Sequence, residues 1–445
     1  MRNLTLDKIR AMEEKFLADP SGVAMMNAAS FNGVGKVCLN PERFMEESFT
    51  FNVDLKQGDV TNQKASGRCW MFASLNVMRN LLMQKHNLKT FELSQAYPLF
   101  FDKLERCNYF LENMIATADE TLDSRVMQFL LGDPLCDGGQ WDMFVNLVKK
   151  YGVVPKYAYP ESFNSSNTYQ MSKYLAKILR KGAHELRSAI KENVSEEKIY
   201  EIKTKFMQKI YDVLVISLGQ PPVKFDLVMK DKDDKIIEDR EITPQDFFNK
   251  YIGMEIDQYI SLINAPTADK PYHKTYTIQY LGNVVEGRIV KHLNLPIEEL
   301  EKAAIKQLKD GHPVWFGCDV GQRYYSDKER ALLDMEAMDF ENLFQVDFTL
   351  DKAEALDYGD SLMTHAMTFT GVHLDEKGEA IRWKVENSWG EDYGYKGYLT
   401  MSRDWFRQYM YQVVVHKKYL PEELQKEYDQ EPTVLKPWDP MGSLA

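Results

Sequence analysis

The stretch from Asn62 to Ala73, NQKASGRCWMFA, constrains this chain more than any other part of the sequence. It places Gln63 six residues before Cys69 and continues into apolar residues spaced three or four apart, from Phe72 to Leu82, which predicts a helix with one buried face. Cys69 would lie in the first turn of this helix. There, free backbone N–H groups and the helix dipole favour a thiolate and lower the thiol pKa from about 8.5. The pattern fits a thiol nucleophile at a helix start.

Gln63 carries a side-chain amide that, with a backbone N–H near Cys69, can stabilise the oxyanion formed when a thiolate attacks a carbonyl. Taken alone, Cys69 is better explained as a buried core thiol, because free cysteine behaves as a small apolar residue. A nucleophile also needs a base and a group that orients the base. The rest of the chain therefore decides between the two interpretations.

Two segments near the C-terminus supply both groups. Met363 to Leu374 and Ile381 to Gly390 alternate like strands and flank the turn-rich sequence DEKG, which predicts a hairpin. The hairpin sets His365 opposite Asn387, within about a residue of register, so the two side chains are within reach of each other. Asn387 could then orient the imidazole, and Trp389 would shield their hydrogen bond from water. The predicted catalytic residues are Cys69, His365, Asn387 and Gln63.

These residues resemble the papain-like cysteine peptidases. The matching pieces occur in the family's order and are Gln63, Cys69-Trp70, His365-Ala366, Asn387 to Gly390, Tyr393-Gly394 and Gly397-Tyr398. A further match, CDGGQWDMFVNLVKKYGVVP, starts at Cys136. The resemblance implies that Gly138 and Gly139 line the cleft and hydrogen-bond an extended substrate backbone.

One departure from the secreted members of this family concerns a disulfide. Their signature has a cysteine three residues before the nucleophile, where this chain has Ser66. In those members that cysteine pairs with the one matching Cys136, so the bridge cannot form here. Five cysteines in 445 residues, with no signal peptide at the N-terminus, indicate a reducing compartment, and we expect a cytoplasmic protein whose cysteines are all free.

The second departure is spacing. His365 lies 296 residues after Cys69, where the signature expects about 130–150, so an insertion of domain size must intervene. With HPVWFGCDVG around Trp315 and the C-terminal sequence DPMGSLA, the chain resembles the bleomycin hydrolase and aminopeptidase C family, and its last residues resemble the bacterial aminopeptidase C members. This resemblance implies an aminopeptidase acting on peptides with a free N-terminus. It also implies a homohexamer held by the insertion and the N-terminal extension.

The expected fold class is α+β, a two-lobed papain-like fold with an N-terminal extension and a large, mostly helical insertion. We expect three units: residues 1–160 for the extension and the helical catalytic half, 161–293 for the insertion with a hairpin, and 294–445 for the β-rich catalytic half and tail. Thr5 to Leu17 reads as a helix, followed by a connecting segment up to Phe31.

Composition excludes other classes of function. The net charge of -12 argues against a nucleic-acid-binding surface, which is usually basic. No apolar run approaches the roughly 20 residues that span a bilayer, so no membrane partner is expected. The histidines have no neighbours at zinc-ligand spacing, and we predict no metal and no cofactor.

The predicted reaction is peptide hydrolysis through a thioester acyl-enzyme. Two alternatives stay open at this point: an acyltransferase that uses the same thioester, and a catalytically silent scaffold of the same fold. The tail EPTVLKPWDPMGSLA would by default be disordered. The resemblance implies instead that it lies in the cleft, where the terminal carboxylate of Ala445 could bind the ammonium group of a substrate.

Overall fold

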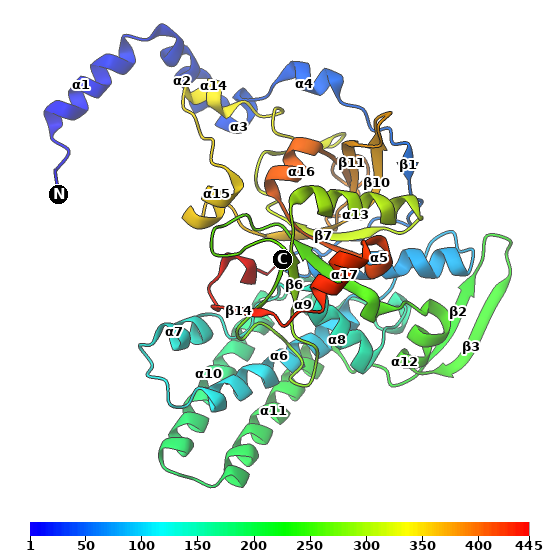
Figure 1. Ribbon diagram of the computed structural model, residues 1–445. Helices are drawn as coiled ribbons and strands as arrows, with labels where there is room; N and C mark the ends of the chain where they lie inside the picture. Colours follow the sequence, from blue (N-terminus) through cyan, green and yellow to red (C-terminus); the bar gives the residue numbers. More distant parts are fainter. Residues whose placement is uncertain (445) are drawn as a thin grey trace.

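The computed structural model describes residues 1–444, and the fold is α+β as the sequence predicts. Helices gather in one part of the molecule and a large mixed sheet in the other, with the two packed against each other (Figure 1). The helices of the cysteine-bearing half are α5 (Cys69–Lys85), α6 (Ala96–Ala116), α7 (Arg125–Gly132) and α8 (Trp141–Tyr151). Helix α5 begins at Cys69, as the sequence pattern predicts, but the expectation of a single buried face is wrong, because every residue from Cys69 to Asn80 is buried.

Within residues 1–444, twelve strands form the large sheet, in the order β14-β5-β6-β4-β13-β7-β10-β11-β12-β9-β8, with β1 paired to β10. Their bounds are β1 (Val53–Asp54), β4 (Tyr259–Ile263), β5 (Lys274–Ile278), β6 (His292–Asn294), β7 (Val314–Cys318), β8 (Tyr324–Ser326), β9 (Ala331–Leu333), β10 (His365–Leu374), β11 (Ala380–Glu386), β12 (Tyr398–Ser402), β13 (Met410–His416) and β14 (Thr433–Leu435). The helices α13 (Ile297–Lys309), α14 (Phe340–Phe344), α15 (Lys352–Tyr358), α16 (Arg403–Tyr409) and α17 (Glu422–Tyr428) accompany these strands.

The region expected to be the insertion divides into two structural parts. Its first part contains the helices α9 (Phe163–Ser166), α10 (Tyr169–Lys191) and α11 (Glu196–Leu218), the hairpin of β2 (Phe225–Lys230) and β3 (Ile236–Ile242), and the short helix α12 (Pro244–Phe247). Its last part differs from the expected division, because β4, β5 and β6 join the large sheet beside β13. Every residue of β4 is buried, and both of its edges are paired, with β6 on one side and β13 on the other.

The N-terminal extension is more helical than the sequence suggested. It contains α1 (Leu6–Leu17), α2 (Pro20–Asn32), α3 (Val34–Val37) and α4 (Pro41–Glu46). The segment expected to connect α1 to Phe31 was predicted wrongly, since Asp19 caps α2 and Pro20 occupies its first turn. Neither α1 nor α2 buries a residue, and Figure 1 shows α1 extending away from the rest of the chain.

The two halves meet along α5. The indole Nε1 of Trp315 in β7 donates to the carbonyl oxygen of Trp70 at 3.2 Å, and Thr368 Oγ1 in β10 donates to the carbonyl oxygen of Ala73 at 3.3 Å. These contacts bring the first turns of α5 against the start of β10, which places Cys69 beside His365. No helix within residues 1–444 is both long enough and apolar enough to cross a membrane.

Candidate active site

The loop before Cys69 is held by backbone and side-chain contacts on both sides. The amide of Gln63 donates to the carbonyl oxygen of Ser388 at 2.8 Å, which ties the loop to the β-rich half. On the other side, the fully buried Arg68 forms a two-pronged ion pair with Glu161, with N···O distances of 3.0 and 2.9 Å. Such bidentate pairs fix geometry as well as charge. The chain is therefore anchored immediately before Cys69, where α5 begins.

Asp137 forms a second anchor for the same loop. Its carboxylate accepts from the backbone amide of Gly67 at 3.2 Å, from the buried ammonium of Lys103 at 2.5 Å and from the hydroxyl of Thr168. Burial alone would raise the pKa of Asp137, but the Lys103 charge and these hydrogen bonds lower it far below its ordinary value. Gly67 has to be glycine, because a Cβ there would lie 2.8 Å from the Asp137 Cβ.

His365 is the first residue of β10, where it pairs with Cys318 of β7. Its Nε2 lies 2.9 Å from Asn387 Oδ1, so the amide oxygen accepts the Nε2 proton and Nδ1 is left as the basic nitrogen. The Trp389 ring lies against the imidazole, with centroids 4.9 Å apart and planes at 37°. His365 and Asn387 are 5% and 4% exposed, so their hydrogen bond is shielded from water.

The predicted register of the hairpin was wrong, although the pair it was meant to bring together is present. Thr368 pairs with Glu386, and the ladder between β10 and β11 ends there, so His365 and Asn387 are not directly opposite residues. Irregularities between Phe369 and Gly371 and near the turn shift the pairing. Asn387 directly follows the last residue of β11, and from that position its side chain reaches the imidazole.

Cys69 is 3% exposed, and the backbone N–H groups of Ala366 and Trp70 act on its thiol. Burial nevertheless raises the pKa of Cys69 to about 11, and burial lowers the pKa of His365 to about 4 against the opposing hydrogen bond to Asn387. The expected lowering of the thiol pKa at the helix start is therefore wrong for this closed site, because desolvation outweighs the backbone N–H groups.

Gln63 lies between the two halves with its amide orientation fixed. Its Nε2 donates to the carbonyl oxygen of Ser66 at 2.7 Å, and its Oε1 accepts from the Ser388 hydroxyl at 2.6 Å. A rotated amide would turn Oε1 toward the Ser66 carbonyl oxygen and lose that hydrogen bond. Because a primary amide has two N–H donors, one remains for a ligand oxygen near Cys69.

Gly138 and Gly139 lie between the nucleophile helix and the tail. The carbonyl oxygen of Gly138 accepts from the Arg106 guanidinium, and a Cβ at Gly139 would lie 2.4 Å from the Trp70 ring. The next residue, Gln140, donates from Nε2 to the carbonyl oxygen of Ser443 at 2.9 Å. Position 139 therefore has no room for a side chain, and the segment lies beside the C-terminal residues through Gln140.

The C-terminal tail is ordered and bridges the two halves at the site. Besides its contact with Gln140, Ser443 donates from Oγ to the carbonyl oxygen of Met363, two residues before His365, at 2.5 Å. Met441 is 6% exposed and packs in the core. The default expectation of a disordered end is wrong for residues up to Leu444, because these contacts are with residues distant in sequence. Ala445 lies outside the described residues.

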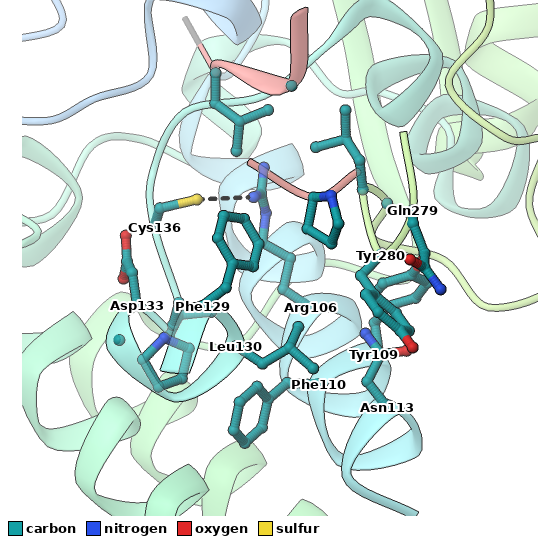
Figure 2. Close-up of a pocket in the computed structure, with 18 of the residues that line it drawn as sticks. Arg106, Tyr109, Phe110, Asn113, Phe129, Leu130, Asp133, Cys136, Gln279 and Tyr280 are labelled. Carbon is teal, nitrogen blue, oxygen red and sulfur yellow. Dashed lines mark hydrogen bonds between the residues drawn. The ribbon is translucent and has the colours of Figure 1, made fainter. Parts of the chain in front are cut away.

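A cavity of about 590 Å³ borders the tail on the side of α6 and α7. Figure 2 shows the Cys136 side chain pointing toward Arg106, whose Nη1 lies 3.3 Å from Cys136 Sγ. Tail residues form one wall, and the lining includes Arg106, Tyr109, Phe110, Phe129, Cys136, Gly138, Tyr280, Pro437, Gly442 and Leu444. Cys136 forms no disulfide within residues 1–444, and at the position of its partner in the secreted peptidases Ser66 donates to the Gln63 carbonyl oxygen.

Several residues that shape the site were missed in the sequence. Asp137 directly precedes Gly138, but no motif in the sequence indicates its role. Its buried partner Lys103 lies on α6, where the sequence contains no functional motif. Gln140 follows Gly139 directly, so its place in the same segment was the available clue. No group of three or more His, Cys, Asp or Glu side chains within residues 1–444 is arranged to hold a metal ion.

This fold, with a buried cysteine at a helix start beside a histidine–asparagine pair, is that of the papain-like cysteine peptidases. The family model described as "Peptidase C1-like family" matches residues 3–442, and the chain belongs to this family. It is 47% identical over 445 residues to the aminopeptidase C of Streptococcus thermophilus, with 100% of both chains covered. It is 42% identical over 451 residues to the bleomycin hydrolase of Homo sapiens, with 99% of each covered. The crystal structure of PepW from Lactobacillus rhamnosis HN001 superposes with a TM-score of 0.97 at 49% identity, covering 100% of this chain and 99% of that one.

Proposed function

We propose that this protein is a cysteine aminopeptidase that releases N-terminal amino acids from peptides through a thioester acyl-enzyme. The observation that carries the proposal is the convergence of Cys69, His365 with its Asn387 partner, and Gln63 at one junction of the two halves. The full-length similarity to proteins named aminopeptidase C supports the substrate class. The reaction needs no cofactor.

In the proposed mechanism, His365 Nδ1 takes the thiol proton as Cys69 Sγ attacks the carbonyl carbon of the first peptide bond. The free N–H of Gln63 and the backbone N–H of Cys69 hold the oxyanion. His365 then gives its proton to the leaving amine as the C–N bond breaks. A water molecule, deprotonated by His365, hydrolyses the thioester and restores the thiol. Asn387 keeps Nδ1 directed at the sulfur throughout, because it accepts the Nε2 proton.

The substrate backbone binds along Gly138 and Gly139, and Trp389 covers the histidine. The tail fills the same side of the cleft, where Gln140 and Met363 hold Ser443. A peptide can therefore extend only about one residue beyond the reacting carbonyl on this side. The carboxylate of Ala445 binds the ammonium group of that residue, which selects peptides with a free N-terminus.

Hydrolysis of a leucine coumarylamide, compared with its N-acetylated form, tests this function directly. The free-amine substrate should be cleaved, and the acetylated one should be cleaved at least about a hundredfold more slowly. Adding a competing amine distinguishes the acyltransferase alternative, since a transferase would form the new amide faster than the free acid. The absence of both products, despite labelling of Cys69 by iodoacetamide, would favour the silent-scaffold alternative.

Deleting Met441 to Ala445 tests the role of the tail. The shortened protein should cleave the acetylated substrate better and the free-amine substrate worse, because the cleft opens and the ammonium partner is lost. An unchanged ratio in a folded variant would limit the assignment to a cysteine peptidase without exopeptidase preference.

The N-terminal extension supports assembly as a homohexamer. Helices α1 and α2 contain no buried residue and expose Leu6, Ile9, Met12, Phe16, Leu17, Met26 and Phe31. Solvated helices rarely carry so many apolar side chains, and a second copy of the chain would cover them. Sedimentation of the full chain should give six copies, and deletion of residues 1–32 should give smaller species. A monomeric full-length protein would contradict the proposal.

The same proposal includes a cytoplasmic location and three structural units. Four of the five cysteines are buried and Cys136 is half-buried, which suits a compartment that keeps thiols reduced. The three proposed units are residues 1–160, the insertion at 161–293, and the β-rich half at 294–445. The insertion's final strands, β4 to β6, are shared with the sheet of the β-rich half.

A further inference from the structure

The last part of the insertion is paired with the tail over its whole approach to the cleft. Strand β14 runs parallel to β5, with Thr433 opposite Tyr276 and Leu435 opposite Ile278. Further along, the amide of Gln279 donates to the carbonyl oxygen of Leu435 at 3.1 Å. The tail therefore enters the site as an added edge strand on the segment between β4 and β6.

An ion pair fixes the tail beyond this strand. Lys270 Nζ lies 3.0 Å from Asp439 Oδ2, and both side chains are largely buried, with 3% and 10% of their surfaces exposed. The other oxygen of Asp439, Oδ1, accepts from the backbone amide of Met441 at 2.9 Å and caps the short turn that follows. One oxygen of the Asp439 carboxylate therefore binds Lys270 of the insertion, and the other stabilises the turn within the tail.

Lys270 also contacts Asp269, which provides an internal comparison. The distance from Lys270 Nζ to Asp269 Oδ2 is 2.9 Å, but Asp269 is 63% exposed. Exposed pairs contribute little because water screens them, whereas a largely buried pair keeps most of its interaction. Asp439 is therefore the partner whose loss should matter.

The anchor lies four residues before Ser443, which contacts both sides of the cleft. Four residues span at most about 14 Å. The buried Met441 side chain, which lies between Asp439 and Ser443, restricts the movement of this segment further. A tail held at Asp439 and Met441 leaves Ser443 few positions other than the observed one. Releasing Asp439 would leave the last residues attached through Met441 and Ser443 alone.

We propose that Lys270 and Asp439 are specificity-determining residues: their ion pair holds the tail in the cleft and so enforces the requirement for a free N-terminus. The inference rests on the proposed aminopeptidase function and gives the last part of the insertion a role in substrate selection. Neither residue touches the reacting atoms, so both act by positioning the tail.

The test is the Asp439→Asn variant of the full-length protein. Asparagine keeps an oxygen that can cap Met441 and nearly the same shape, but it removes the charge that binds Lys270. The ratio of acetylated to free-amine substrate cleavage should rise about tenfold, the equivalent of one hydrogen bond between charged groups. The matched control, Asp269→Asn, should leave this ratio within about twofold of the wild-type value.

A second variant, Lys270→Gln, removes the same ion pair from the other side and should raise the ratio in the same direction. Thermal unfolding of each variant shows whether it is folded. An unchanged ratio in folded Asp439→Asn or Lys270→Gln protein would overturn the inference, as would an equal effect of Asp269→Asn. Failure of the proposed function looks different, because the wild-type protein would then not cleave the free-amine substrate at all. A tail deletion that changes the ratio while both point variants do not would leave the proposed function standing and refute the anchor.

Discussion

The two sides of the cleft position their reactive groups by different means. On one side, Cys69 is placed by a contiguous segment, since the loop from Asn62 and the first turn of α5 fix it through backbone contacts and two anchoring carboxylates. On the other side, His365 and Asn387 are 22 residues apart and meet only through the pairing of strands. The position of the proposed nucleophile is thus a local feature of the sequence, whereas the position of the proposed base depends on the register of a sheet.

One of the polar contacts that join the two sides is ionic. Arg79 of α5 and Glu386 at the end of β11 form a pair with an N···O distance of 2.5 Å, and their side chains are 2% and 0% exposed. Glu386 directly precedes Asn387, so this pair links the helix of the nucleophile to the residue that orients the base. The local side and the register-dependent side are therefore coupled behind the site.

The largest expected effect comes from the local side. Cys69→Ala should lower turnover at least about a thousandfold, because it removes the nucleophile while changing little packing volume. The rate of amide hydrolysis by the purified variant measures this. Cys107→Ala is the matched control, since Cys107 is an equally buried thiol in α6, and it should keep activity. Substantial turnover by the Cys69 variant would disprove the mechanism.

Glu386→Gln tests the coupling between the two sides. It leaves the Arg79 charge buried without an ionic partner, so the free energy of unfolding should fall by about 3–5 kcal/mol. Urea unfolding measures the change, and kcat should fall with it because Asn387 shifts. Replacing both partners, as Arg79→Met with Glu386→Leu, should recover much of the stability, since no buried charge remains. If the single and double variants were equally destabilised, packing rather than charge would explain the contact.

The same contrast explains how far the sequence could be interpreted. The start of α5 at Cys69 and the helix that ends at Leu17 follow from local apolar periodicity and were predicted correctly. The sequence predicted the hairpin of β10 and β11 but not its register. The ladder contains two irregularities that the alternation of apolar and polar residues does not reveal. Gln63 could be selected from its spacing to Cys69, but its hydrogen bond to Ser388 could not.

The sequence pattern does not predict contacts between segments that are distant along the chain. The short, mostly apolar run from Tyr259 to Ile263 is consistent with a buried strand, but only the structure shows that β4 pairs with β13. The anchoring of the tail by Lys270 is of the same kind, since 169 residues separate it from Asp439. The local pattern at the start of α5 does not reveal the raised pKa of Cys69, because the burial that raises it arises only when the chain is folded.

The register-dependent side contains two buried histidines, and both should make stability depend on pH. Burial lowers the pKa of His365 and of His292 to about 4. Between about pH 6.5 and pH 4 the unfolded chain binds a proton at each site that the folded chain does not, so stability falls as the pH drops through this window. Each histidine accounts for roughly 3 kcal/mol between those limits.

Urea unfolding between pH 7 and pH 4 measures this dependence. His292→Gln should flatten the curve by about one proton, because glutamine can still pair with Ser261 but does not titrate. The exposed His184 is the control, and His184→Gln should leave the slope unchanged. If His292→Gln left the slope unchanged as well, the buried imidazole would not be the source of the acid sensitivity.

The smallest of these effects distinguishes the role of Asn387 from that of His365. Asn387→Ala should lower kcat about a hundredfold, less than His365→Ala, because the base is still present but its Nε2 proton loses its acceptor. The imidazole can then rotate or adopt the other tautomer, so a smaller fraction of molecules presents Nδ1 to the Cys69 sulfur. Asn387→Asp offers a sharper test, since a carboxylate also accepts the proton but raises the pKa of the imidazole. Its activity should be partly restored, and its acid limb should move to higher pH. Equal losses for Asn387→Ala and His365→Ala, with no recovery in the aspartate variant, would mean that Asn387 supports the strand end rather than the histidine.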